Sequence, residues 1–455
     1  MIRLFSHWFS RRTLFEIAFD VVLLIAIVLG AAWLQRIDAP RIAALMPHAL
    51  IFALVAATVN KTIGFHQFDA SCKPTTVLVL ASISLMLSAP VAYAIFDEIP
   101  QRDSHYAVLQ VSALLALVAT IAIRVAVVCL GFHLNLTKRV MVIGTGPEAQ
   151  AMQHALHRDV QLVGFYPAGE TVNYIPQEHI VPSDVSLSEA ICRLEVDEVV
   201  VAVAERRGGS MPMDALLDCK LAGIRVLDLP SYFERWLGQV RLDSLRASWL
   251  VFEDGFRQGV LRTTVKRVFD IVVGSILLML AAPLIALTGL LIFLESGRPL
   301  FYRQERIGLY GRPFTLTKFR SMRPDAESDG TPRWASSQDE RVTRVGKIIR
   351  NYRIDELPQL LNVLRGDMSL VGPRPERPYF VERLTHEVPF YGARHSVKPG
   401  LTGWAQVCYQ YGSSSEDAVN KLQFDLYYVK NHTLFLDLVI LEKTVRVVAT
   451  GKGAQ

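Results

Sequence analysis

The stretch VKRVFDIVVGSILLMLAAPLIALTGLLIFLESGRP, residues 265–299, holds an apolar run long enough to cross a bilayer, with Pro283 near its middle. Lys266 and Arg267 lie just before the run, and a strongly basic segment follows it. Since Lys and Arg favour the cytoplasmic face, both flanks favour the same side of the membrane. A proline removes a helix hydrogen bond and clashes with the preceding turn. We therefore predict a re-entrant helix-break-helix over about residues 266–294, with a straight, kinked span as the alternative.

Four further apolar runs precede this one, and each is about long enough to span a membrane as a helix: residues 15–34, 42–59, 75–96 and 106–130. Basic residues precede the first run, separate the second from the third and follow the fourth, whereas the loop before the fourth is acidic. By the positive-inside rule, the N-terminus and everything after residue 131 are cytoplasmic. The pattern predicts a four-helix transmembrane bundle over residues 1–131.

The composition of the chain agrees with a membrane protein. Of the 455 residues, 51% are hydrophobic, and the formal net charge is +5. This charge suits the cytoplasmic face of a membrane and is too mild to indicate nucleic-acid binding. The cysteines are far apart and lack metal-ligand spacing. We therefore expect no nucleic-acid partner and no cysteine-based metal site.

Residues 138–157, KRVMVIGTGPEAQAMQHALH, have the pattern of a strand, a Gly-x-Gly turn and a helix. The glycine fingerprint is Gly144 and Gly146, with Ala149 at the third position. No clear ribose-binding acid ends the second strand, where LVGFYPAGE stands, so nucleotide binding is left open. A strand at 196–203 and the pattern MDALLDCKLAGIRVLDLP continue an α/β domain. We predict a cytoplasmic Rossmann-like domain with its linker over residues 132–262, in a regulatory or structural role.

The stretch RIDELPQLLNVLRGDMSLVGPRPE, residues 353–376, combines adjacent carboxylates with a short amphipathic run. Leucines recur at helical spacing after Pro358, and Gly366 stands where a helix would stop. Asp355 and Glu356 would then lie at the electropositive start of a short helix. Carboxylates there are ordinary capping residues, or they lie beside a bound phosphate or metal. The local pattern leaves both readings open.

Five motifs in order resemble the polyisoprenyl-phosphate hexose-1-phosphate transferases, the monotopic bacterial sugar transferases. They are KRVFD, FTLTKFRSM, RIDELPQLLNVLRGDMSLVGPRPE, KPGLTGWAQV and KLQFDLYYVKN. The whole chain resembles the large form of that family, in which four transmembrane helices and a Rossmann-like domain precede the catalytic module. LLDCKLAGIRVLDLPSYFER and SWLVFEDGF resemble the subgroup associated with exosortase-type exopolysaccharide loci. The resemblance implies a mixed membrane protein of the bacterial inner membrane, with an α/β-containing catalytic module at 263–455 on the cytoplasmic face.

The same resemblance implies a reaction at the Asp-Glu pair. Asp355 is implied as the nucleophile, with Glu356 as its partner and Mg²⁺ held at both. An ordinary aspartate is ionised at pH 7 and needs no base, and Mg²⁺ takes one or two carboxylates plus substrate phosphates. Asp355 would displace UMP from a UDP-sugar, and undecaprenyl phosphate would attack the resulting sugar-phosphoryl aspartate. Glucose or galactose 1-phosphate is the expected cargo, for exopolysaccharide or glycan repeat-unit assembly.

Other motif residues are expected to bind the substrate. The family's Pro-Arg motif contacts the nucleotide, which implies Pro373 and Arg374. Lys318 and Arg320 would alternate onto one face of a strand and bind diphosphate, unless that strand is merely a solvated basic one. Asp425 matches a family acid and is expected to tune the metal site, with a surface ion pair as the alternative.

Two other function classes agree with parts of the sequence. A membrane-bound nucleotide-sugar dehydratase or epimerase would need a complete dinucleotide site and a Tyr-x-x-x-Lys pair, but Tyr427 and Lys430 are only three apart. A non-enzymatic scaffold for polysaccharide assembly is the other alternative. The expected partners are a UDP-sugar, undecaprenyl phosphate, membrane lipids and, as a hypothesis, a second copy of the chain joined through the Rossmann-like domain.

Overall fold

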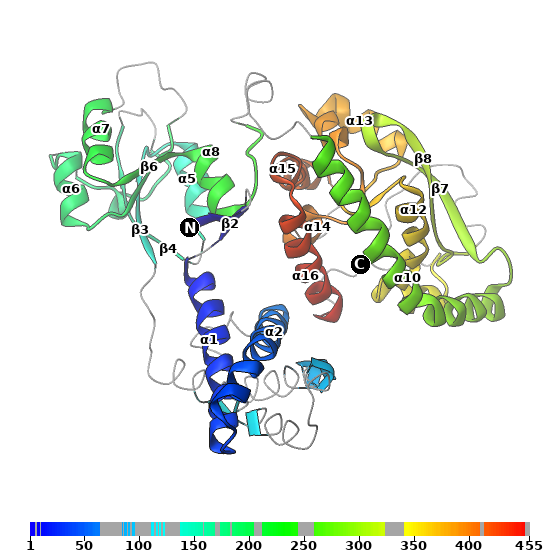
Figure 1. Cartoon of the computed structure of the whole chain (residues 1–455). Coiled ribbons are helices and arrows are strands. Elements are labelled where there is room, and N and C mark those ends of the chain that lie inside the picture. The colour runs from blue at the N-terminus through cyan, green and yellow to red at the C-terminus, as the bar shows by residue number, and fades with distance from the viewer. Residues whose placement is uncertain are drawn as a thin grey trace. The chain divides into compact units, whose positions relative to one another are not determined.

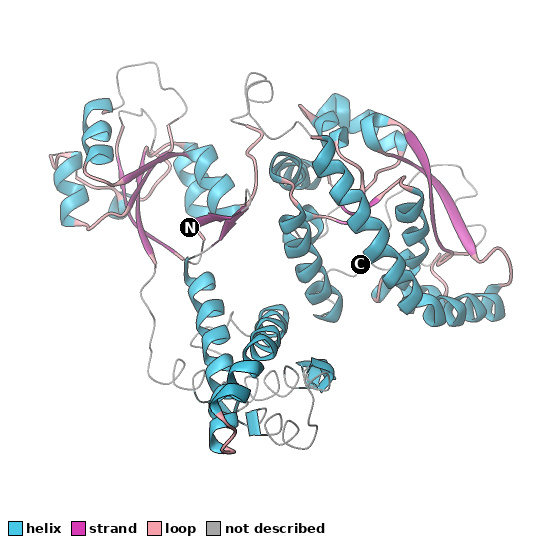
Figure 2. Cartoon of the chain, in the orientation of Figure 1, coloured by secondary structure: helices cyan, strands magenta, loops and turns pink. Residues whose placement is uncertain are grey.

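In this computed structural model, the described residues are 1–4, 7–9, 11–63, 137–157, 159–168, 173–182, 184–203, 212–243, 259–323, 341–409 and 414–450, with separate residues between 84 and 122. The chain divides into two compact units, drawn in Figures 1 and 2. One consists of residues 1–2 and 9–138, and the other of residues 3–8 and 139–455. Two short strands, β1 (Ile2–Leu4) and β2 (His7–Phe9), pair near the N-terminus.

The smaller unit contains the helices α1 (Arg11–Leu34) and α2 (Ala39–Ile63), which match the first two predicted spans. Their shared core is rich in alanine, and small side chains let helices approach closely. Within α1, Thr13–Leu34 is long and apolar enough to cross a membrane, whereas the apolar part of α2, Leu45–Lys61, is shorter. The third and fourth predicted spans lie mostly outside the described residues.

A four-stranded sheet with the order β4-β3-β5-β6 begins the larger unit. Its elements are β3 (Lys138–Ile143), α5 (Pro147–His154), β4 (Val160–Tyr166), η1 (Gln177–His179), α6 (Leu187–Arg193), β5 (Glu198–Val201), α7 (Met213–Leu221), β6 (Arg225–Asp228), α8 (Leu229–Tyr232) and the π-helical turn η2 (Phe233–Leu237). The strands β3, β5 and β6 are parallel, with Val142 opposite Val200 and Val200 opposite Leu227. Figure 1 shows α6 and α7 on one face of the sheet and α5 on the other, which explains the nearly continuous apolar strands. The predicted strand, glycine turn and helix are present.

The rest of the larger unit surrounds the 353–376 stretch. Its elements are α10 (Val260–Ser296), β7 (Phe301–Ile307), the turn η3 (Leu309–Gly311), β8 (Pro313–Phe319), α11 (Arg344–Asn351), the 3-10 turn η4 (Ile354–Gln359), α12 (Leu360–Arg365), β9 (Ser369–Val371), α13 (Pro378–Glu387), the 3-10 turn η5 (Tyr391–Ser396), β10 (Gly400–Thr402), α14 (Trp404–Cys408), α15 (Ser415–Asn431) and α16 (Leu434–Thr450). The strands β7 and β8 form an antiparallel ribbon, and β9 pairs with β10 in parallel.

The helix α10 is continuous through Pro283, where we predicted a break. Figure 1 shows instead that this helix changes direction sharply partway along its length. Proline is a usual cause of such a bend, because its ring clashes with the preceding turn and it lacks an N–H group. The predicted helix-break-helix is therefore corrected to a bent helix.

Both ends of α10 are attached to the same folded part of the chain. Near its start, Arg267 donates hydrogen bonds to the carbonyl oxygens of Val363 and Leu364, at 2.7 and 2.6 Å. Near its end, the Glu295 carboxylate accepts hydrogen bonds from backbone N–H groups at the start of α11. A straight helix would separate its two ends by about 1.5 Å per residue, and the bend shortens this separation.

The first part of α10 is also tied down by buried charges. Lys266 forms a 2.6 Å ion pair with the buried Asp437. Asp270 accepts hydrogen bonds from the Ser369 hydroxyl and the Leu370 N–H group, at 3.0 and 3.1 Å. The basic residues that we interpreted as membrane-side markers thus bind inside the fold. Along the middle of α10, in contrast, most large apolar side chains are exposed, which suits contact with lipid.

Residues 229–243, which we call the docking segment, join the sheet to α14 and α15. The Trp404 indole N–H group donates to the carbonyl oxygen of Gly238 at 2.7 Å, and Glu234 forms a 3.0 Å ion pair with Lys430. Gly238 has a φ of 64°, and a Cβ at this position would lie 2.9 Å from the Trp404 ring. The sheet therefore leads directly into a segment that is packed on the C-terminal part of the chain.

Candidate active site

The Asp-Glu pair lies in the 3-10 turn η4, just before α12. Arg353 precedes it with a left-handed φ of 55°, and Gly366, with a φ of 96°, ends α12 where we predicted the stop. The predicted helix is therefore present, but Asp355 and Glu356 are inside the 3-10 turn rather than at an α-helix N-terminus. The surrounding side chains, more than a helix dipole, must then set their chemistry.

Glu356 is held by two guanidinium groups. An Arg374 nitrogen lies 2.8 Å from one carboxylate oxygen, and an Arg353 nitrogen lies 3.8 Å from the other. Burial alone would raise the pKa of Glu356, but the charges of Arg374 and Arg353 lower it below its ordinary value. Glu356 is therefore an ionised carboxylate whose two oxygens already face cations.

Asp355 has the opposite character. Its side chain is buried and makes no hydrogen bond or ion pair with any residue in the described ranges. Burial and the neighbouring Glu356 charge raise the pKa of Asp355 to about 6, although Lys318 and Arg374 oppose this shift. Its oxygens are therefore available to an incoming electrophile or cation.

Lys318 supplies positive charge from the neighbouring strand β8. Burial lowers the pKa of its ammonium group to about 8, and the attraction of Asp355 opposes that shift. The Lys318 nitrogen also lies 5.3 Å from the centre of the Tyr302 ring, and the two residues are opposite each other in the ribbon. The ribbon thus presents a cation that remains charged at neutral pH.

Arg374 is carried by the Pro373–Pro375 loop after β9, and two further arginines hold this loop. Arg394 donates a 2.9 Å hydrogen bond to the carbonyl oxygen of Arg374, and Arg306 donates a 3.1 Å hydrogen bond to that of Pro375. The structure therefore brings together five of the residues that the sequence singled out: Asp355, Glu356, Lys318, Arg374 and the adjacent Pro373.

Arg320 is placed elsewhere. The strand β8 ends at Phe319, so the expected alternation with Lys318 does not continue. The buried Arg320 guanidinium donates hydrogen bonds to the carbonyl oxygens of Ser296 and Gly297, at 2.8 and 2.9 Å. It therefore binds the C-terminal end of α10 and faces neither carboxylate of the pair.

Asp425 also lies away from Asp355 and Glu356. It is buried on α15 and forms a 2.8 Å ion pair with Arg394. Burial raises its pKa to about 6, and the charge of Arg394 opposes that shift. Asp425 is therefore in an ion pair, as the alternative prediction had it, but the pair is buried and not on the surface.

Two side chains near the site, those of Arg394 and Arg306, were not among the candidates predicted from the sequence. Arg394 has no distinctive local pattern. Arg306, however, belongs to a series with Tyr302 and Gln304 at every second position of β7, and its guanidinium donates a 2.7 Å hydrogen bond to Gln304. Alternate residues of a strand share one face, so this polar period of two next to Lys318 was the available signal.

The site fits a hard divalent cation only in part. The described portion of the chain has no group of three or more His, Cys, Asp and Glu side chains that could hold a metal. Glu356 already faces two guanidinium groups, which leaves Asp355 as the free carboxylate. Mg²⁺ commonly binds through one or two carboxylates plus substrate phosphates, so this donor set suits an ion that arrives with the diphosphate.

The glycine turn of the sheet is filled by the chain itself. A Cβ at Gly144 would lie 2.4 Å from the carbonyl oxygen of Ala202, so this glycine allows a close backbone approach. The buried Thr145 hydroxyl lies 2.6 Å from the Asn173 amide oxygen, and the Tyr174 N–H group donates to the Thr145 carbonyl at 2.8 Å. Gly144 therefore has a packing role here.

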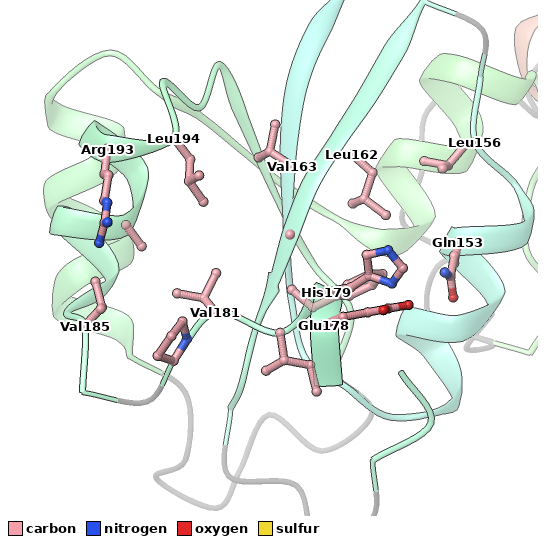
Figure 3. A pocket seen from close by; sticks show the side chains of 15 residues that line it. Gln153, Leu156, Leu162, Val163, Glu178, His179, Val181, Val185, Arg193 and Leu194 are labelled. Carbon is pink, nitrogen blue, oxygen red and sulfur yellow. The ribbon is translucent and has the colours of Figure 1, made fainter. Parts of the chain in front are cut away.

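A hollow of 620 Å³ lies elsewhere in this domain, along the edge strand β4 (Figure 3). Figure 3 shows Leu162 and Val163 on opposite sides of the strand, with Leu156 and Gln153 on the side of the first and Leu194 on the side of the second. The hollow thus borders the outer edge of the sheet and is separate from the Asp-Glu pair.

The C-terminal part of this chain matches a known family. The family model described as bacterial sugar transferase matches residues 261–451. The UDP-N-acetylgalactosamine-undecaprenyl-phosphate N-acetylgalactosaminephosphotransferase of Aeromonas hydrophila is 44% identical over 240 residues, which cover 53% of this chain and 56% of that protein. The undecaprenyl-phosphate glucose phosphotransferase of Komagataeibacter xylinus is 33% identical over 336 residues, 69% of this chain and 59% of that protein. The chain thus spans little more than half the length of these two relatives.

A third relative is covered more fully. The UDP-glucose:undecaprenyl-phosphate glucose-1-phosphate transferase of Caulobacter vibrioides is 46% identical over 193 residues, which cover 42% of this chain and 71% of that protein. The family model includes the Asp-Glu pair, the Lys318 strand and the Arg374 loop within its matched residues. On this similarity, the chain belongs to the bacterial sugar transferase family.

Proposed function

We propose that this chain transfers a sugar 1-phosphate from a UDP-sugar to undecaprenyl phosphate and releases UMP, as a first step in assembling an exopolysaccharide or another glycan repeat unit. One observation carries the proposal: the buried Asp355 carboxylate has no hydrogen-bond or ion-pair partner among the described residues and lies in the field of Lys318 and Arg374. The names of the three relatives support the lipid substrate. Since those names include glucose and N-acetylgalactosamine, a substrate screen should begin with these UDP-sugars and UDP-galactose.

The chemistry follows from a carboxylate that needs no general base. An Asp355 oxygen attacks the phosphorus that carries the sugar, and the bond from this phosphorus to the UMP oxygen breaks as UMP leaves with the electron pair. An oxygen of undecaprenyl phosphate then attacks the same phosphorus, and Asp355 is released as a carboxylate. Repulsion between the carboxylate and the diphosphate opposes the first step, and Lys318 and Arg374 offset it.

Mg²⁺ is part of the proposal. Asp355 and Glu356 would hold the ion together with the substrate phosphates. When bound, the ion supplies further neutralisation of the phosphate charge. Glu356 keeps Arg374 at the site through the 2.8 Å ion pair, whether or not it contacts the ion.

The first prediction tests the covalent step. Wild-type protein with Mg²⁺ and its UDP-sugar, but without lipid, should release UMP up to one equivalent and gain a sugar-phosphate mass on the peptide that contains Asp355. Asp355→Asn should abolish both signals, because an amide cannot act as this nucleophile. Glu356→Gln should still form detectable intermediate, since it leaves the nucleophile in place. Mass spectrometry and a UMP assay give the two readouts.

Added undecaprenyl phosphate should remove the adduct. UMP release only when both substrates are present, with no trapped adduct, would instead favour direct transfer and leave Asp355 as a metal ligand. No UMP release with any UDP-sugar would favour a scaffold. The dehydratase alternative is disfavoured because the Tyr427 hydroxyl is buried and lies 2.7 Å from a His7 ring nitrogen, while Lys430 pairs with Glu234.

The membrane arrangement belongs to the same proposal. We place the catalytic module on the cytoplasmic face of the bacterial inner membrane, with α10 re-entrant, residues 1–131 as a four-helix bundle and residues 132–262 as a Rossmann-like domain. Attachment of both α10 ends to one fold supports re-entry, and the sheet order β4-β3-β5-β6 supports the Rossmann-like assignment. A homodimer remains a prediction.

The second prediction tests this topology. Single cysteines at Thr264 and Arg303, both exposed and on either side of the bent helix, should react with a membrane-impermeant thiol reagent from the same side of sealed vesicles. The assay needs a protein without the native cysteines. It compares the extent of labelling in intact vesicles with that in opened vesicles. Labelling from opposite sides would contradict re-entry.

A further inference from the structure

The loop that carries Arg374 is hydrogen-bonded through its backbone to the buried guanidinium of Arg394. Arg394 donates a 2.9 Å hydrogen bond to the Arg374 carbonyl oxygen, and only 6% of Arg394 is exposed. The Arg374 side chain, in contrast, is 37% exposed and reaches Glu356. Arg374 can therefore meet a ligand, whereas Arg394 acts on it only through the loop backbone.

Arg394 is itself fixed by two groups from different elements. Asp425 of α15 lies 2.8 Å from one of its nitrogens, and the Tyr391 hydroxyl lies 2.6 Å from another. Asp425 is 2% exposed. A buried guanidinium without a counter-charge is strongly unfavourable, so loss of the Asp425 charge must displace Arg394 or admit water around it.

These contacts form one series from α15 to the Asp-Glu pair: Asp425, Arg394, the Arg374 backbone, the Arg374 side chain and Glu356. Within the described ranges, Asp425 makes no hydrogen bond or ion pair with either residue of the Asp-Glu pair, and its ion-pair partner is the Arg394 guanidinium. The contacts thus give Asp425 a route to Glu356 through Arg394 and the Arg374 loop.

We propose that Asp425 and Arg394 are positioning residues that aim Arg374 at the substrate diphosphate. Asp425 fixes the Arg394 guanidinium, and Arg394 fixes the Arg374 carbonyl and hence the direction of its side chain. Neither residue contacts substrate or metal. This inference rests on the proposed function in one respect: the ligand of Arg374 is taken to be a nucleoside diphosphate group.

The test measures binding of UDP, which carries the diphosphate without the sugar, by calorimetry on the full-length protein in detergent with Mg²⁺, beside turnover of the UDP-sugar. Asp425→Asn should raise the Kd for UDP and the KM for the UDP-sugar by about tenfold or more, as expected for a misaligned charge-assisted contact. The Mg²⁺ concentration for half-maximal activity should not change. Tyr391→Phe, which leaves the Asp425 pair in place, should raise the Kd by about threefold.

A double-mutant cycle identifies the route of the effect. In an Arg374→Ala background, Asp425→Asn should cause no further loss of UDP affinity, because both changes act through one side chain. Glu234→Gln is the matched control, since it breaks an ion pair on the same helix α15 but touches no part of the Arg374 loop. It should leave the Kd for UDP unchanged.

Two results would overturn the proposal. One is a changed Mg²⁺ requirement with an unchanged Kd for UDP, which would assign Asp425 to the metal. The other is full additivity of Asp425→Asn with Arg374→Ala, which would indicate a general structural role. If Asp425→Asn does not fold, the Tyr391→Phe cycle decides between the same outcomes. A wild-type protein that binds UDP but releases no UMP would reject the transferase proposal while leaving the positioning test intact.

Discussion

Asp355 and Glu356 are neighbours in the chain, yet their surroundings shift their pKa values in opposite directions. Burial dominates at Asp355 and raises its pKa to about 6, whereas two guanidinium groups lower that of Glu356. Opposite pKa shifts in two adjacent acids indicate different roles. Ion pairs keep Glu356 ionised, whereas the Asp355 carboxylate is available to a ligand. The sequence predicted this pair and Arg374. It could not predict Arg394, because its partner Asp425 is brought near only by tertiary packing.

The third prediction concerns Lys318. Because burial lowers the pKa of Lys318 to about 8, its ammonium group is charged below this pH and neutral above it. If the charge offsets repulsion at the diphosphate, kcat/KM should fall as pH rises through about 8. Lys318→Arg should lose activity overall but show no such decline up to pH 10, since a guanidinium stays charged. The measurement is a pH profile of UMP release, and an identical alkaline decline in Lys318→Arg would assign it to another group.

At the scale of elements, the length, apolar character and proline of α10 were predictable, but its continuity was not. The sequence shows that Pro283 weakens this helix. Whether the helix breaks or bends there depends on the contacts at its two ends, which the sequence does not show. The same limit applies to β8. Period-two alternation placed Lys318 correctly but was extended one residue too far, because the partners of Arg320 at the end of α10 are distant in sequence.

The fourth prediction separates these two basic residues. Arg320→Met should leave buried carbonyl groups at the end of α10 without their donor and reduce the free energy of unfolding by about 1–3 kcal/mol. It should barely change the KM for the UDP-sugar. Lys318→Met should do the reverse, with weakened activity and nearly unchanged stability. Thermal unfolding in detergent and initial rates are the measurements, and a large rise in KM for Arg320→Met would return it to the substrate site.

At the scale of the whole molecule, composition and charge pattern predicted a membrane protein with an α/β domain and a C-terminal module. What they could not give is how tightly the last two are joined. The docking segment has no strong periodic signal, because its contacts are single side chains that meet backbone groups far along the chain, such as Trp404 at Gly238.

The fifth prediction tests that junction. Gly238→Ala places a Cβ 2.9 Å from the Trp404 ring at a residue with a φ of 64°, so it combines steric overlap with backbone strain. We expect a loss of about 1–3 kcal/mol in the free energy of unfolding. Gly259→Ala is a matched control, since a Cβ there meets nothing within 4 Å. Differential scanning calorimetry should show the loss for the first variant only, and equal behaviour of the two would mean that the junction is loose.

The docking segment also bears on where the catalytic module begins as an independently folding piece. The family match starts at residue 261, but Trp404 and Tyr427 are covered in part by residues that precede it. A fragment cut at residue 255 would keep every family motif and still expose an aromatic surface that is buried in the full chain. Exposed apolar surface of this kind promotes aggregation. The boundary given by homology therefore differs from the one given by packing, which keeps the docking segment with the C-terminal part of the chain.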